Sequence, residues 1–318
     1  MHGEFELINR WLAPAHVSTM DTGVVLGAGD DACLLSPTAG QQLVVSVDTS
    51  VEGHHFPAEA PASAVGHRAL AVSLSDLAAM GARPRWCLMS LALPVSDAAW
   101  VAEFAKGFHA LCDAVKVNLV GGDVTAGERA VSVTVMGEAE PARALRRSGA
   151  RAGDILAVTG ALGGGAGGLA AWQAGERDLQ HPLLSRYLLP QPRLEAGIAL
   201  AELASSAIDI SDGLLADLGH VLEASKVGAE LDAQAIPLAE GLVDMLGEEG
   251  AMQAALSGGD DYELLVTLAP EQLAAAQAEL ASSGLALTAI GRLVEGSGID
   301  GLKMPTKAGW QHFGGGQP

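Results

Sequence analysis

Apolar and polar positions alternate along the chain in patterns that predict strands and helices in turn. Short β-branched runs between turn residues are typical of strands, and longer runs with apolar residues every three or four positions are typical of helices. In the first half the pattern predicts strands at 43–47, 85–93, 117–120 and 130–137. It predicts helices at 64–80 and 96–115, with Ser96 as the N-cap of the second.

The second half repeats this alternation after a Pro-, Arg- and Gly-containing hinge at 138–153. Strands are predicted at 154–159, 207–210, 262–268 and 285–293, and helices at 168–174, 193–204, 213–224 and 270–282. A proline-containing loop is predicted at 180–192. Strands interleaved with helices predict an α/β (α+β) fold class, with two domains of mixed sheets flanked by helices.

Charge and cysteine content narrow the classes of function. With 18 Lys and Arg residues against 38 Asp and Glu residues, the net charge is -20, so nucleic acid is not an expected partner. An acidic protein that binds phosphates needs cations held by carboxylates. The 3 cysteines form no CxxC pair and favour a reducing, cytoplasmic compartment. No segment has the pattern of a membrane span or of a signal peptide.

Several aspartates lie at predicted element ends or in glycine turns. Asp48, Asp123 and Asp212 each have a structural explanation, as a turn residue or a helix N-cap. Asp76 differs, because it lies on an otherwise apolar helical stripe, where a carboxylate needs a metal or an ion-pair partner such as Arg68 or Arg83. Together the aspartates of both halves predict a magnesium site, since Mg²⁺ prefers hard oxygen ligands.

Other candidate motifs are weaker. The glycine run 163–168 formally matches a dinucleotide fingerprint, but a run this rich in glycine matches by chance, and the acidic residue expected further on is absent. It can still approach an anion through helix-terminal amides. Arg147 is either a phosphate clamp or part of a solvated basic patch, and His54 and His55 are either ligands or surface histidines. The chain has no P-loop and no protein-kinase signature.

An ordered set of segments covers nearly the whole chain: Gly29-Asp30-Asp31-Ala32, Ser46 to Phe56, Ala69 to Ala82, Gly121-Gly122-Asp123, Arg147-Ser148-Gly149-Ala150, Asp209 to Leu214 and Ser257 to Leu264. As a set they resemble the thiamine-monophosphate kinase family, within the superfamily typified by aminoimidazole ribonucleotide synthetase. The resemblance implies a metal- and nucleotide-binding, dimerising N-terminal domain of that type at 1–140. It implies a C-terminal α/β domain at 141–318 that completes the active-site cleft.

The resemblance also implies the ligands and their residues. A homodimer would phosphorylate thiamine monophosphate with ATP as co-substrate and several Mg²⁺ ions, without a general base or a covalent nucleophile. The metal ligands would be Asp30, Ser46, the carbonyl of Val47, Asp48, Asp76, Asp123, Asp209 and Asp212. The nucleotide would meet Gly122, Asp123, Arg147 and Ser211, and the substrate would meet His55, Asp260 and Trp310.

Departures from the family pattern leave alternatives. Asp260 stands where Glu is usual, Val124 where Thr or Ser is common, and Trp310 where Tyr or Phe is usual. The alternatives are another ATP-using synthetase of the superfamily and a non-catalytic nucleotide- or metal-binding regulator. A selenophosphate synthetase needs a reactive residue near the N-terminus, for which Cys33 is a poor fit.

Overall fold

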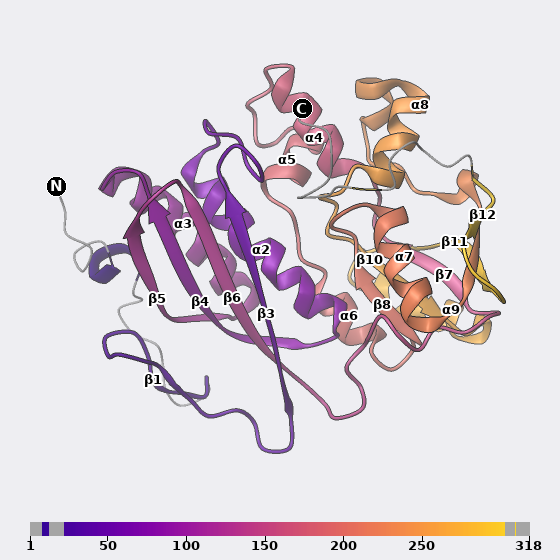
Figure 1. The fold of residues 1–318 in the computed structure, drawn as a ribbon, viewed down its shortest axis with the longest axis horizontal. Helices are drawn as coiled ribbons and strands as arrows, with labels where there is room; N and C mark the ends of the chain where they lie inside the picture. Colours follow the sequence, from indigo (N-terminus) through magenta and orange to yellow (C-terminus); the bar gives the residue numbers. More distant parts are fainter. Residues whose placement is uncertain (1–7, 13–21, 303–308, 310–318) are drawn as a thin grey trace. The chain divides into compact units, whose positions relative to one another are not determined.

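The chain folds as two compact units in a computed structural model that describes residues 8–12, 22–302 and 309 (Figure 1). The first unit comprises Met1–Leu77, Ala82–Ala144 and Leu188–Leu194, and the second comprises Ala78–Gly81, Leu145–Tyr187 and Glu195–Pro318. The main division therefore falls between residues 144 and 145, and each unit takes one short segment from the other half of the sequence.

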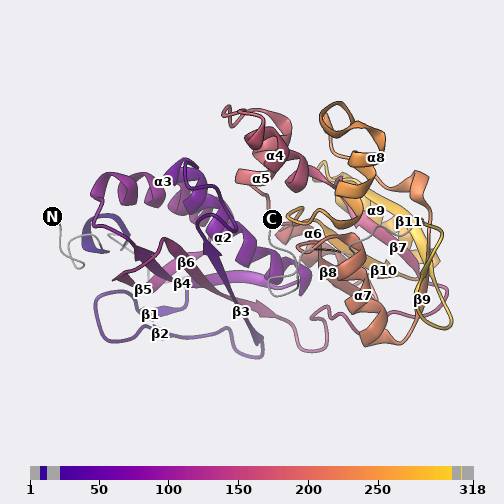
Figure 2. The ribbon, with the colours of Figure 1, turned by 45° about the horizontal axis from the view of Figure 1, so that its top comes forward.

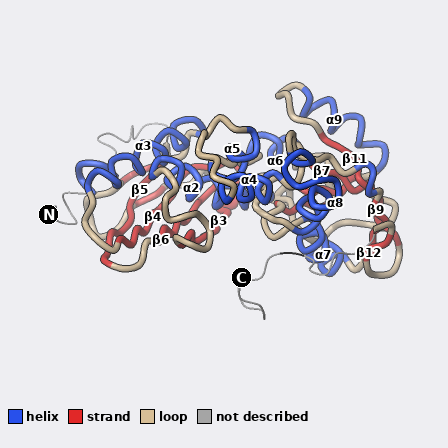
Figure 3. The backbone as a smooth tube through the Cα atoms, turned by 90° about the horizontal axis from the view of Figure 1, so that it is seen from above, coloured by secondary structure: helices blue, strands red, loops and turns tan. Residues whose placement is uncertain are grey.

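The first unit is a sheet of four strands in the order β3-β6-β4-β5, covered on one face by two helices (Figure 3). The strands are β3 (Gln42–Val51), β4 (Arg83–Leu93), β5 (Asn118–Ala126) and β6 (Ala130–Ala139). Strand β6 pairs antiparallel with β3 and β4, whereas β4 and β5 are parallel. The helices are α2 (Ala62–Ala79) and α3 (Ala98–Val115), and a five-residue helical turn, η1, spans Ile8–Leu12. A ribbon of β1 (Val24–Leu26) and β2 (Leu34–Leu35) lies on the other side of the sheet (Figure 2).

Helices α2 and α3 approach each other backbone to backbone at two glycines. A Cβ atom on Gly107 would lie 1.8 Å from the Ser63 carbonyl oxygen, and one on Gly66 would lie 2.1 Å from the Phe104 carbonyl oxygen. Both distances are far below van der Waals contact, so only glycine fits at this crossing. Phe104 and Phe108 of α3 are buried beside this crossing, where their backbone atoms face Gly66 of α2.

The second unit is built on a sheet of six strands in the order β12-β9-β11-β7-β10-β8. These strands are β7 (Ile155–Thr159), β8 (Ser206–Asp209), β9 (Gly228–Leu231), β10 (Leu264–Leu268), β11 (Leu287–Val294) and β12 (Ile299–Asp300). The helices are α4 (Gly164–Gln173), α5 (Pro182–Leu188), α6 (Leu194–Leu200), α7 (Leu214–Ser225), α8 (Leu242–Ser257) and α9 (Leu273–Ala281), with short 3₁₀ turns η2 (Ala233–Ala235) and η3 (Pro270–Gln272). Every residue of β8 and β10 is buried, as expected of strands covered on both faces.

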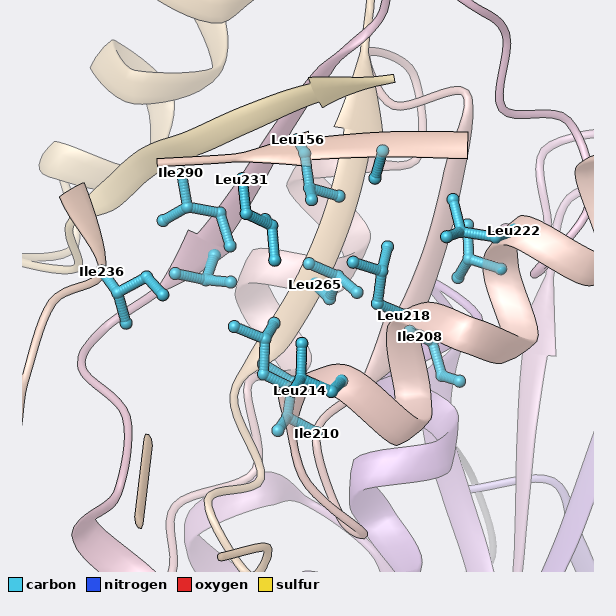
Figure 4. Close-up of a cluster of buried hydrophobic side chains, with 14 of the residues drawn as sticks. Leu156, Ile208, Ile210, Leu214, Leu218, Leu222, Leu231, Ile236, Leu265 and Ile290 are labelled. Atoms are coloured by element: carbon cyan, nitrogen blue, oxygen red, sulfur yellow. The ribbon is translucent and has the colours of Figure 1, made fainter. Parts of the chain in front are cut away.

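The core of this unit forms where α7 packs on the sheet (Figure 4). Leu214 and Leu218 of α7 lie against Leu156 of β7 and Leu265 of β10 in one buried cluster. The apolar residues of α7 recur at helical spacing, so one face of the helix enters this cluster. The N-terminal end of α7 is thereby fixed against the end of β8.

The predicted mixed α/β architecture is confirmed, but several elements differ in detail. The N-cap of α3 is Asp97 rather than Ser96, because the Asp97 carboxylate accepts from the Ala99 and Trp100 amides at 3.1 Å each. Strand β5 continues through Gly122 and Asp123 instead of ending before them, since it pairs with β4 along its length. The predicted loop 180–192 contains α5. Strand β9 and helix α8 were not predicted.

The glycine crossing predicts a measurable loss of stability. We expect Gly107→Ala to lower the free energy of unfolding by about 1–3 kcal/mol, because the added methyl group forces α2 and α3 apart. Denaturant unfolding followed by circular dichroism measures this change. The control is Gly219→Ala in α7, where an added Cβ meets nothing within 4 Å and a gain of about 0.5–1 kcal/mol is expected. Equal shifts in the two variants would contradict the crossing.

Candidate active site

Two carboxylates of the first unit face each other between β3 and α2. Ser46 and Asp48 point from β3 toward the helices, and the Ser46 hydroxyl donates a short hydrogen bond to the Asp76 carboxylate of α2. Burial and the charge of Asp76 raise the pKa of Asp48 to about 6, against the opposing hydrogen bond from Ser73. A buried carboxylate that faces a second carboxylate is an arrangement that a divalent cation neutralises. Magnesium commonly uses one or two protein carboxylates and completes its shell with water and phosphate, so this pair fits it.

His55 lies in the turn that follows β3. Its Nδ1 accepts a hydrogen bond from the Val51 amide at 3.1 Å, and its carbonyl oxygen accepts from Arg68 Nε at 3.1 Å. Because a backbone amide can only donate, the neutral imidazole must carry its proton on Nε2. The hydrogen bond from Val51 therefore fixes the tautomer of the neutral His55 ring and leaves its Nε2–H as a donor. Arg68, one of the ion-pair partners considered for Asp76, is buried and holds this turn.

Asp30 and Asp123 line a cavity on the opposite face of the sheet. The cavity has a volume of about 790 Å³ and lies between the segment Gly27–Cys33 and strands β4, β5 and β6. Gly122 is also part of its lining, and a Cβ there would lie 1.9 Å from the Met89 carbonyl oxygen. Close packing of β5 on β4 thus explains this glycine without any ligand.

Strand register places the acidic residues of this unit on two faces. Asp48 is opposite Val133 of β6, and Val133 is buried under the helices. Asp123 is opposite Ser90 of β4, which in turn is opposite Ser132 of β6 and lines the cavity. Residues that pair directly share a face, so Asp48 and Asp123 point to opposite faces. Accordingly, among residues 22–302, no group of three or more His, Cys, Asp or Glu side chains is close enough to hold one metal ion.

The acidic loops of the second unit lie side by side. Strand β8 ends at Asp209, which pairs with Leu264 at the start of β10. Beyond the strands the pairing continues, because the Tyr262 amide donates to the Ile210 carbonyl and the Asp260 amide donates to the Ser211 carbonyl, both at 2.8 Å. The structure therefore brings the predicted residues Asp209, Ser211, Asp212 and Asp260 to one end of this sheet.

The loop that carries Asp260 has an uncommon backbone. Asp260 and Tyr262 both have positive φ angles, 61° and 51°, which residues with side chains rarely adopt. The Tyr262 hydroxyl donates to the Asp260 carboxylate at 2.8 Å and helps to fix this conformation. Such strained residues cluster at ligand sites. This is a physical signal for Asp260 that is independent of any motif.

Backbone amides of the glycine run 163–168 bind a carboxylate of the protein itself, that of Asp261. The Asp261 carboxylate accepts from the Gly163 amide at 2.8 Å and from the Gly165 amide at 3.2 Å, at the N-terminus of α4. Desolvation raises the pKa of Asp261 to about 7, against these two hydrogen bonds. The amides that a dinucleotide phosphate would use are thus occupied. The interpretation of the glycine run as a chance match agrees with this geometry.

One predicted residue, Arg147, is not brought to these groups, and another lies beyond what the structure describes. The Arg147 side chain is exposed, and its carbonyl oxygen accepts from Ser225 at 3.1 Å, at the C-terminal end of α7. Since α7 has 12 residues, that end is roughly 18 Å from Ser211 and Asp212. Trp310 lies outside the described residues.

Asp217 is the residue of this region that the sequence interpretation missed. Its carboxylate accepts from the backbone amides of Ser211, Asp212 and Gly213. The signal that singled out Asp76 was also present here, since Asp217 lies on α7 between the apolar positions Leu214 and Val221 at helical spacing. In both units a helical carboxylate on an apolar stripe thus lies beside predicted site residues, Asp76 beside Ser46 and Asp217 at the amides of Ser211 and Asp212.

The fold and its paired carboxylates define the class of protein. The chain matches the AIR synthase related protein models, the N-terminal domain over residues 29–139 and the C-terminal domain over residues 151–302, and it belongs to that class. None of the described helices is long and apolar enough to cross a membrane.

Within this class the chain belongs to the thiamine-monophosphate kinase family. It is 41% identical to the Escherichia coli thiamine-monophosphate kinase over 94% of this chain and 92% of the relative. The crystal structure of thiamine-monophosphate kinase from Stenotrophomonas maltophilia matches with 45% identity and a TM-score of 0.84, covering 89% and 92% of the two chains. AaThiL, complexed with AMPPCP and TMP, matches with 33% identity and a TM-score of 0.78, covering 87% and 89%.

The Asp48–Asp76 pair predicts that removing one charge stabilises the metal-free protein. The folded state raises the pKa of Asp48 from 3.8 to about 6. The protonated carboxyl therefore contributes to the free energy of unfolding at low pH, and this contribution is lost as the pH rises through about 6. In the presence of a chelator, we expect Asp48→Asn to gain on the order of 1–3 kcal/mol over the wild type at pH 8 and little at pH 4. Denaturant unfolding at both pH values measures this. Asp113→Asn, at an exposed position of α3, should show no such gain, and an equal gain would contradict the pair.

Proposed function

We propose that this chain transfers the γ-phosphoryl group of ATP directly to the phosphate of thiamine monophosphate, with Mg²⁺ ions held by its aspartates. Phosphorylation of thiamine monophosphate is the activity named for its curated relatives. The observation that carries the proposal is the relative of the same fold that binds an ATP analogue, AMPPCP, together with TMP. The ATP-dependent kinase activity follows from family membership, and the residue roles below are our proposal.

The physical problem of this reaction is repulsion between anions. The acceptor phosphate is already ionised near neutral pH, so it needs no general base, and none is assigned. Two polyanions must meet on a protein of net charge -20, which requires cations between them. When bound, Mg²⁺ supplies this charge neutralisation and aligns the reacting oxygens. The protein residues contribute by holding these ions and by orienting both substrates.

The proposed magnesium ligands follow the groups seen in each unit. On the helix-covered side of β3, a cation would be held by Asp48 and Asp76, together with Ser46 and the Val47 carbonyl. Asp30 and Asp123 would serve the cavity face, and Asp209 and Asp212 would serve the sheet end of the second unit. Each group offers hard oxygen donors in pairs, which suits an ion that keeps part of its water shell.

The remaining proposed contacts concern the two substrates. Gly122, Asp123, Ser211 and Arg147 would contact the nucleotide, and Arg147 is supported only by its exposed guanidinium. His55 would donate from Nε2 to an oxygen of the acceptor, a role supported by its fixed tautomer. Asp260 would meet the cationic thiamine moiety, and Trp310 would stack on it.

We also propose a cytoplasmic homodimer in which β3 lies at the contact. Its alternation is inverted: Ser46 and Asp48 face the helices, whereas Leu43, Val45 and Val47 are 49%, 53% and 59% exposed. Strand β3 is also an edge of its sheet. An exposed apolar stripe on an edge strand is typical of a protein interface, and a second copy would cover it.

The kinase proposal predicts a loss of turnover without a loss of fold. With ATP, Mg²⁺ and thiamine monophosphate, the wild type should form thiamine diphosphate and ADP in equal amounts, and a chelator should stop the reaction. We expect Asp48→Asn and Asp123→Asn each to lower kcat by on the order of 10²-fold or more, because each removes a cation ligand. Chromatography of the products measures this, with Asp113→Asn as the control. Near-normal turnover of either variant at saturating Mg²⁺ would refute its ligand role, and no product from the wild type would refute the function.

The dimer proposal predicts that one charge on the stripe separates the subunits. We expect Val45→Lys to convert a dimer to a monomer, because the lysine would have to be desolvated within the contact. Light scattering after size exclusion gives the mass directly. Val95→Lys alters a valine that is 66% exposed outside the stripe and should leave the mass unchanged. A wild-type monomer, or a Val45→Lys dimer, would disprove this contact.

A further inference from the structure

A single carboxylate oxygen organises the loop that follows β8. Oδ2 of Asp217 accepts from the Ser211 amide at 3.0 Å and from the Asp212 and Gly213 amides at 3.1 Å each. Asp217 itself is buried, with 3% of its surface exposed. Three successive amides that converge on one atom leave the backbone of this loop little freedom.

The loop at Ser211–Gly213 is hydrogen-bonded in turn to the neighbouring loop that carries Asp260. The Ser211 carbonyl accepts from the Asp260 amide at 2.8 Å, so holding Ser211 also holds the start of the strained turn at Asp260. A Cβ on Gly259 would lie 2.6 Å from the same Ser211 oxygen, which shows how closely the two loops pack. The Asp217 carboxylate thus sits behind both loops that carry acidic residues at this end of the sheet.

Burial of this carboxylate is costly, which argues that the arrangement is not incidental to helix capping. The Asp217 carboxylate is buried and lies near Asp212, so it gives up hydration and faces a like charge. A serine or threonine cap would satisfy amides without placing a second carboxylate beside Asp212. The acceptor geometry, three amides to one oxygen, is the property that Asp supplies.

We propose that Asp217 is a positioning residue, which holds the backbone of Ser211, Asp212 and Gly213 in the shape that binds the metal–nucleotide complex. The inference rests on the proposed function, because Ser211 and Asp212 are its proposed nucleotide and metal contacts. Residues that orient metal ligands from behind typically change affinity about 10–100-fold when they are replaced.

Two substitutions separate the hydrogen-bonding oxygen from the negative charge. Asp217→Asn keeps an acceptor oxygen at the same reach and removes the charge. Asp217→Glu keeps the charge and moves the oxygen by one methylene group. If Asp217 is a positioning residue, Asp217→Asn should bind Mg²⁺–AMPPCP with an affinity within about threefold of the wild type. Asp217→Glu and Asp217→Ala should weaken this binding by about tenfold or more. Isothermal titration measures this binding without turnover.

Asp154→Ala is the matched control. Asp154 is also a buried aspartate of this unit and accepts from the Arg151 amide at 3.0 Å and the Ser205 hydroxyl at 2.6 Å. It directly precedes β7, whose first residue pairs with the last residue of β10, so it lies at the end of the sheet away from Ser211. We expect Asp154→Ala to lower the melting temperature but to leave Mg²⁺–AMPPCP affinity unchanged. Equal affinity losses in Asp154→Ala and Asp217→Ala would overturn the positioning role.

A second readout does not depend on the proposed function. Hydrogen exchange of the ligand-free protein reports the Ser211–Gly213 amides directly, and Asp217→Glu should speed their exchange by about tenfold or more, whereas Asp217→Asn should not. Unchanged exchange in Asp217→Glu, or equally fast exchange in Asp217→Asn, would overturn the inference. If the wild type failed to bind Mg²⁺–AMPPCP, the proposed function would fail while the exchange result still decided whether Asp217 holds the loop.

Discussion

The cost of placing carboxylates near one another, away from water, is the constraint on which the site depends. A desolvated carboxylate must be protonated, hydrogen-bonded by amides or neutralised by a cation. The fold uses different solutions in its two units. In the second unit, Asp217 and Asp261 are held by backbone amides. In the first unit, Asp48 faces Asp76, and a hydrogen bond from Ser73 opposes the rise in its pKa without cancelling it, so a cation is the solution that we propose there.

This difference separates structural aspartates from ligand candidates. Glu263 is a third buried carboxylate with partners inside the protein, beside Asp217 and Asp261. Thr159 donates to it at 2.7 Å, and Arg186 lies 3.6 Å away. Its charge is satisfied within the unit. Asp48 and Asp123, which the sequence proposed as metal ligands, lie instead at positions with partial access to solvent or to the cavity, whereas Asp209 is buried at the end of β8. The acidic residues of the chain thus divide by how each charge is balanced.

The sequence predicted the fold class and most elements, because these follow from local periodicity. It predicted Asp76 as a site residue for a physical reason, an acid on an apolar stripe, and the structure places a second carboxylate beside it. It could not predict which face of the sheet each aspartate occupies, because β3 turns its polar Ser46 and Asp48 toward the helices and its apolar side chains outward, and its register comes from pairing with β6. Nor could it show that Asp217 and Asp261 bind amides, since those partners depend on loops that meet only in the folded chain.

Carboxylates of the protein itself occupy backbone amides at the N-termini of α4 and α7, and this affects how phosphate could be bound. Helix N-termini commonly bind phosphate through free amides. Here the amides at the start of α4 hold Asp261, and those before α7 hold Asp217. A phosphate approaching either end would meet a carboxyl group of the protein on these amides. In an acidic chain with this arrangement, the attraction for ATP and for the acceptor phosphate would, on the proposed function, come chiefly from bound cations. On the proposed function, these internal carboxylates would make phosphate binding depend on metal, which the proposed ligands such as Asp48 and Asp123 would hold.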